Sequence, residues 1–257
     1  MTHRLQAVLT FVGLFSIFCC FYIFPVNNAN AIGLPTITFG VEDANTPGQV
    51  SNALQVLFVL TILSVAPAIL LMTTCFTRIV IVLGFVRQAM GTQNMPPTQV
   101  ILGLSLFLSF FVMSPTINRI NEEALQPYMN EQLDQPAALE KALAPMRDFM
   151  FSQVREDELT LLTEITMDTE PEDQIDIPTM TLIPAFMLSE LKRAFQMGFM
   201  IYIPFLVIDM IVASVLMSMG MMMLPPVIIS MPFKLLLFVL VDGWSLVVGS
   251  LIKSFGI

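Results

Sequence analysis

The chain has 257 residues, of which 56% are hydrophobic and 12% are charged, and its formal net charge is −9. Soluble domains carry about 25% charged residues, so this composition excludes an ordinary soluble protein and indicates a membrane protein. The single histidine is His3, and cysteine occurs at only three positions. These counts argue against a Ser-His-Asp triad, a histidine-ligated metal and a thiolate cluster, so we expect no metal and no cofactor.

The first 31 residues are predicted to be a cleavable signal peptide. A positive start at Arg4 precedes the mostly apolar stretch from Val8 to Ile23, and Ala29-Asn30-Ala31 supplies small residues for cleavage after Ala31. We expect the mature chain to begin on the far side of a bacterial inner membrane. An uncleaved membrane anchor is the alternative, because the apolar stretch is long for a signal.

Residues 32–115 are predicted to contain a first hydrophobic helical hairpin. Residues 54–72 carry no charge and are long enough to cross a bilayer, with a predicted kink at Pro67. The second apolar stretch, residues 100–113, is expected to end at Ser114-Pro115, because proline interrupts the hydrogen bonding of a helix.

Residues 116–184 have a different composition, with fifteen acidic and four basic residues and hence a net charge of −11. Such a block must lie in water. Arg78 and Arg87 are expected to mark the cytoplasmic boundary, so the positive-inside rule places the loop of residues 87–98 in the cytoplasm and the acidic block in the periplasm. Apolar residues at helical spacing predict a helix around residues 139–150, and residues 165–176 are predicted to be a loop.

Residues 185–257 are apolar again and predict a second hydrophobic helical hairpin. Asp209 and Lys234 interrupt its apolar runs, and a charge near the centre of a lipid-facing helix is costly. We therefore expect these helices to face protein, within an oligomer or a larger assembly. Snorkelling of the charged side chains at helix ends is the alternative.

The turn of this second hairpin, residues 217–226, holds five methionines within seven residues and ends with two prolines. The prolines break the helix. Methionine is flexible and polarisable, so a break lined with it suggests a deformable seal. A tight turn that happens to be rich in methionine is the alternative interpretation.

Two acidic residues near this hairpin are candidate functional groups. Glu190 can pair with Arg193 on one helix face, or it can reach Lys234 on another helix or another subunit, where such a pair would fix register. Asp209 is a candidate proton-coupled carboxylate, because an ionisable residue within the membrane is a functional hypothesis by default. We find no pairing of a nucleophile with a base, so the sequence predicts no enzyme.

Long ordered motifs resemble the FliP/SctR family of type III secretion, and in particular its flagellar export-gate proteins. The resemblance covers nearly all of residues 50–255 apart from the acidic block. The matching runs are Arg78–Leu83, Arg87–Gln93 with Pro96-Pro97, Ser189–Leu191, Ala194-Phe195, Gly198-Phe199, Ile203–Asp209, Met217–Pro226, Pro232–Lys234 and Val241–Trp244.

The resemblance implies an all-α membrane protein whose helical hairpins assemble into a conical helical oligomer. A small helical extracytoplasmic domain would lie between the second and third hydrophobic segments. Several copies, usually a pentamer, would surround an export channel together with FliQ and FliR, and would work with FlhA, FlhB and the basal body. Much of the cone would lie above the membrane plane, so the apolar segments need not all span the bilayer.

The resemblance also implies roles for particular residues. Met221, Met222 and Met223 would form a gasket around the pore. Glu190 and Lys234 would form an inter-subunit salt bridge, and the buried charge Asp209 also matches the family pattern.

The function implied is that of a pore-forming core subunit of the flagellar export gate. It would pass unfolded axial proteins across the inner membrane at the flagellar basal body, without binding nucleic acid. The signal peptide and the long acidic insert favour the flagellar branch over a virulence-type export-gate subunit. Two other classes stay open: a secondary transporter or proton channel using Asp209, and a structural scaffold in which the methionine run is only core.

Overall fold

The computed structural model describes residues 47–92, 95–167, 173–221 and 224–256. The predicted signal peptide and its cleavage site at Ala31 lie outside these residues. The chain divides into two compact units with a boundary between Val56 and Leu57, and the contacts described below all lie within the second unit.

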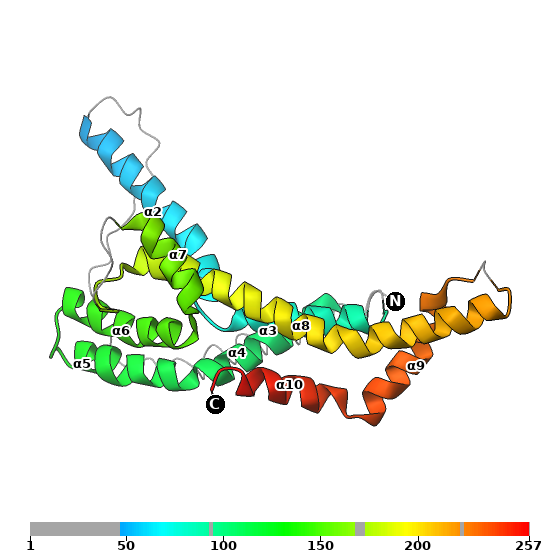
Figure 1. Ribbon diagram of the computed structural model, residues 1–257. Coiled ribbons are helices and arrows are strands. Elements are labelled where there is room, and N and C mark those ends of the chain that lie inside the picture. The colour runs from blue at the N-terminus through cyan, green and yellow to red at the C-terminus, as the bar shows by residue number, and fades with distance from the viewer. Residues whose placement is uncertain (1–46, 93–94, 168–172, 222–223, 257) are drawn as a thin grey trace, which may run out of the picture. The chain divides into compact units, whose positions relative to one another are not determined.

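All regular elements in the described residues are helical, which confirms the predicted all-α class. Figure 1 shows their arrangement. In chain order they are α2 Pro47–Met72, α3 Phe76–Ala89, α4 Thr98–Ile120, the π-helical turn Asn121–Leu125, α5 Gln126–Met129, α6 Gln135–Gln153, α7 Glu156–Thr166, α8 Thr179–Ser218, α9 Pro226–Leu240 and α10 Gly243–Lys253.

Three stretches of the described chain are long and apolar enough to cross a membrane, namely Gln55–Met72, Thr98–Met129 and Thr179–Ser218. Helices α9 and α10, which meet at an angle of 64°, add a fourth if they are counted as one broken span. The first stretch agrees closely with the prediction for residues 54–72. Residues 57–72 of α2 are exposed except for the half-buried Ala66, which is an apolar surface suited to contact with lipid or protein.

The predicted end of the second span at Ser114-Pro115 is wrong. Helix α4 continues through Pro115, and helical structure extends to Met129. Helix α8 likewise runs for 40 residues through Pro184, Pro204 and Asp209. A proline removes one backbone donor, and the neighbouring hydrogen bonds of a long helix keep it intact. The domain boundaries predicted at 115 and 184 therefore fall inside helices.

Helix α3 forms the centre of the larger core. Its side chains Ile79, Val82, Leu83 and Val86 recur at three- and four-residue steps and are buried between α4 and α8. At Gly198 of α8 any Cβ would overlap the ring of Phe85, so glycine permits close approach of the two helices there.

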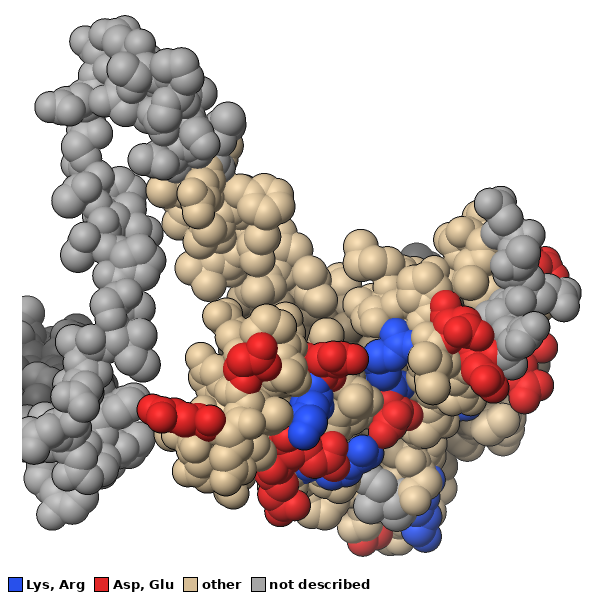
Figure 2. Space-filling model, turned by 90° about the vertical axis from the view of Figure 1, so that its left-hand side faces the viewer, with Lys and Arg blue, Asp and Glu red and all other residues tan. Residues whose placement is uncertain are grey.

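A smaller core joins the acidic segment to the start of α8. Met150, Ile177, Leu182 and Phe186 are its buried members, contributed by α6, the turn before α8, and α8 itself. Arg147 fastens the same turn by donating to the carbonyls of Gln174 and Ile177 and to the hydroxyl of Thr179. Figure 2 shows acidic and basic side chains intermingled on one face of the molecule. The predicted helix around residues 139–150 thus lies within α6, and α6 shares this smaller core with the start of α8.

Candidate functional site

A fully buried ion pair joins α3 to α8. Arg78 Nε donates to Glu190 Oε2 at 2.9 Å, and Arg78 Nη2 donates to Glu190 Oε1. Both side chains have a relative exposure of 0%. A two-point guanidinium–carboxylate pair fixes the relative position and rotation of the elements that carry it. Arg78 was expected to mark the cytoplasmic boundary, and instead it lies in the protein interior.

Gln153, at the end of α6, connects this ion pair to the acidic segment. Its Oε1 accepts from Nη2 of Arg78 and from Nη1 of Arg193, each at 3.1 Å. Arg193 thus contacts Gln153, and the predicted local pair of Glu190 with Arg193 does not form in this chain. Gln153 could not be singled out from the sequence, because an uncharged residue in an acidic block does not reveal its burial.

A second ion pair joins α8 to α9. Lys234 Nζ donates to Asp209 Oδ2 at 2.6 Å, and the hydroxyl of Ser230 donates to the other carboxylate oxygen, Oδ1. The Lys234 side chain is 3% exposed and that of Asp209 is 25% exposed. These contacts explain how an apolar hairpin tolerates both charges, since each neutralises the other.

The structure does not bring Glu190 and Lys234 together within one chain. Glu190 binds Arg78, and Lys234 binds Asp209. Their predicted contact joins two subunits, so it stays a prediction, but each residue would have to share or exchange the partner it has here.

The methionine-rich turn lies between α8 and α9. Helix α8 ends at Ser218, and Gly220 adopts a left-handed conformation with φ of +74°, which glycine accepts without steric cost. Met221 N donates to the Leu216 carbonyl at 3.0 Å, and the Met221 side chain is 42% exposed. Met222 and Met223 lie outside the described residues. Pro226 begins α9, where a missing backbone donor is no loss.

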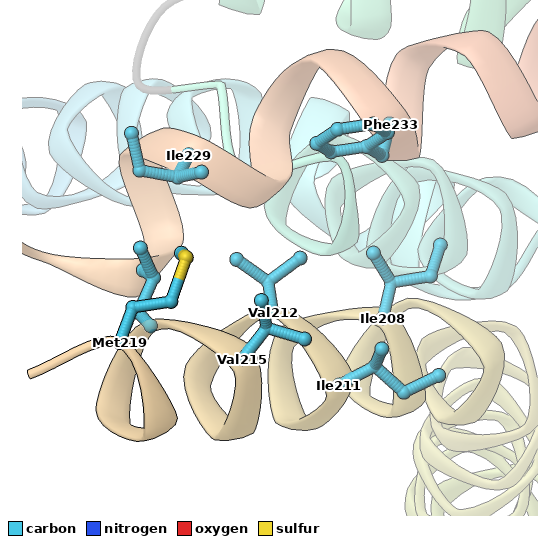
Figure 3. A pocket seen from close by; sticks show the side chains of 8 residues that line it. Ile208, Ile211, Val212, Val215, Met219, Ile229 and Phe233 are labelled. Atoms are coloured by element: carbon cyan, nitrogen blue, oxygen red, sulfur yellow. The ribbon is translucent and has the colours of Figure 1, made fainter.

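An apolar groove of about 460 Å³ runs between α8 and α9 next to this turn. Figure 3 shows side chains of both helices lining it, with Met219 at the end near the turn. Its lining residues are Ile208, Ile211, Val212, Val215, Leu216, Met219, Ile229 and Phe233. The surface of the hairpin between α8 and α9 is therefore apolar, and so is its outer surface.

The remaining chemistry of the described residues is limited. They contain no group of three or more His, Cys, Asp or Glu side chains arranged to hold a metal ion. Cys75 is buried beside the Ser109 hydroxyl, at 3.3 Å from Sγ to Oγ, and burial raises the pKa of its thiol to about 11 despite that hydrogen bond. A thiol with so high a pKa is a poor nucleophile at neutral pH.

Fold and site together define an all-helical membrane protein with charges buried in pairs and an exposed methionine-rich turn. A model of the FliP family matches residues 59–251, and the chain belongs to that family.

Proteins named flagellar biosynthetic protein FliP are similar over most of the chain. The one from Bacillus subtilis strain 168 is 57% identical over 215 residues, covering 84% of this chain and 97% of the relative. The one from Pectobacterium carotovorum is 54% identical over 203 residues, covering 79% of each. The one from Aquifex aeolicus is 49% identical over 212 residues, covering 81% of this chain and 88% of the relative.

Proposed function

We propose that this chain is a pore-forming core subunit of the flagellar type III protein export apparatus in the bacterial inner membrane. Family membership and the names of the relatives support a role in flagellar biosynthesis. The more specific proposal, that the chain forms a pore, rests on the methionine-rich turn between α8 and α9. An assembly of several copies with FliQ and FliR would bring these turns together around a channel for unfolded axial proteins.

The turn has the properties that a deformable seal needs. Met217, Met219 and Met221 are 59%, 58% and 42% exposed in the single chain, so they have room to contact other copies. Thioether side chains are apolar enough to exclude ions and flexible enough to re-pack when a polypeptide passes. Helix α8 ends at Ser218 and α9 begins at Pro226, so the residues between them belong to neither helix.

The inter-subunit bridge between Glu190 and Lys234 belongs to the same proposal. It is tested by co-expressing one copy carrying Glu190→Cys with a second carrying Lys234→Cys, both with native cysteines replaced. A disulfide-linked dimer that neither single variant forms supports the bridge. If the complex assembles and no such dimer forms, the bridge is contradicted.

Asp209 is explained without a proton pathway. Its carboxylate is occupied by Lys234 and Ser230, which is the arrangement of a structural ion pair. This disfavours the transporter hypothesis, in which a carboxylate must bind and release a proton during each cycle.

Complementation tests the functional proposal. A Bacillus subtilis strain that lacks its own FliP is given this chain, with the strain's own protein as positive control and an empty vector as negative control. The proposal predicts restored swimming and restored secretion of axial proteins. Stable, membrane-inserted chain without either effect would count against it.

A further inference from the structure

The turn that follows α10, Ser254-Phe255, closes the buried site around Arg78. Nη1 of Arg78 donates to the Ser254 carbonyl at 3.0 Å and to the Ser254 hydroxyl at 2.9 Å. The ring of Phe255 covers the guanidinium, at 3.9 Å from Cζ to the ring centroid. Gln153 Nε2 donates to the Phe255 carbonyl at 3.3 Å. Elements distant in sequence therefore meet at one guanidinium.

The hydrogen-bond acceptors of the guanidinium come from α8, from α6 and from the turn after α10. Glu190 neutralises the charge and accepts from Nε and Nη2, and Gln153 also accepts from Nη2. Only Ser254 accepts from Nη1 among the contacts described. A buried donor left without an acceptor is costly, so the site is incomplete until the turn is in place.

We propose that Ser254-Phe255 is a strap that holds α6 of the acidic segment against α3 and α8 by way of Arg78. Gln153 is the link, because it bonds both to Arg78 and to the strap. Opening the strap removes acceptors from Arg78 and Gln153 together and loosens α6. The position of α6 is thereby coupled to that of the α9–α10 pair, which carries the strap at its far end.

The strap acts on the end of α6 that carries Gln153. The rest of α6 is held by the smaller core, to which it contributes Met150, and by Arg147, which donates to the turn before α8. By contrast, α3 is buried along its whole inner face against α4 and α8. Loss of the strap therefore loosens this end of α6 and leaves the α3 region closed.

The test uses the full-length chain in detergent and an arginine-specific protease. Phe255→Ala is expected to speed cleavage after Arg147 and Arg155 by about fivefold or more, the effect of losing a desolvated cation–π contact. Cleavage after Arg87, next to α3, stays unchanged. Lys253→Gln is the matched control, because it alters an exposed neighbour and is expected to have no effect.

Two outcomes overturn the strap. One is unchanged cleavage after Arg147 and Arg155, and the other is equal acceleration after Arg87, which indicates general loss of stability. If Phe255→Ala fails to fold, Phe255→Leu keeps an apolar side chain and removes the ring from the guanidinium. A double-mutant cycle of Phe255→Leu with Gln153→Met, which remove two contacts of the same guanidinium, then decides: non-additive cleavage rates support the strap, and additive rates contradict it.

Discussion

Arg78 and Glu190 lie 112 positions apart in the chain and form a two-point ion pair with both side chains fully buried. Such a pair adds little net stability over well-packed apolar residues, but removing one partner leaves a buried charge. This asymmetry makes the pair a determinant of how α3 and α8 fit together, and it yields a direct prediction.

Arg78→Ala is expected to lower the free energy of unfolding by about 3–5 kcal/mol, because it leaves the Glu190 carboxylate buried and unpaired. Denaturant unfolding in detergent measures the change. Arg87→Ala is the control, since half-buried Arg87 donates, within the part of the chain that the structure describes, to the exposed Thr98 hydroxyl, and its loss is expected to cost less than about 1 kcal/mol. The double variant Arg78→Leu with Glu190→Leu is expected to recover most of the stability. A double variant as unstable as Arg78→Ala would show that the charges themselves are needed.

Asp209→Asn is expected to impair export, because it leaves the ammonium of Lys234, which is 3% exposed, without its counter-charge. Combining it with Lys234→Met removes both charges and should restore the packing of α8 against α9, while the proposed bridge to Glu190 is lost. Secretion of axial proteins measures export, and denaturant unfolding in detergent measures the packing. Normal export by Asp209→Asn alone would contradict the need for this counter-charge.

Gly198→Ala is expected to destabilise the chain by about 1–3 kcal/mol, because the new methyl group overlaps the ring of Phe85 and forces α3 away from α8. Gly84→Ala, in the interior of α3 with open space around its Cβ position, is the matched control. It is expected to be neutral or stabilising by about 0.5–1 kcal/mol. Adding Phe85→Leu to Gly198→Ala should relieve the overlap. Equal effects at the two glycines would contradict the close approach.

Cys75 is expected to react slowly with thiol reagents. With its pKa raised to about 11 from 9.0 by burial, the thiolate fraction at pH 8 falls about a hundredfold. The folded chain's labelling rate should still be rising with pH above pH 9, where an exposed thiol levels off. A variant with Cys19 and Cys20 changed to serine restricts labelling to Cys75, and the same chain unfolded is the control. Folded and unfolded chains with the same pH profile would show that Cys75 is accessible.

The sequence predicted helix positions well where apolar runs were long and free of charge, as in residues 54–72. It failed at Pro115, because a single proline weakens a long helix without ending it. The partners of the buried charges could not be predicted from the sequence, because Arg78 meets Glu190 only through tertiary packing. The same is true of Gln153, because its hydrogen-bond partners lie on three segments that no sequence pattern or spacing connects.

The proposed seal of a channel by the methionine-rich turn is tested most directly by ion conductance through the assembled complex. Met221, Met222 and Met223 are all changed to alanine, and Met129, Met180 and Met200 serve as a matched control set of exposed methionines elsewhere. Native gels confirm assembly in both. A methionine seal predicts raised conductance for the first set alone. Unchanged conductance in a complex that still assembles and exports would contradict the seal.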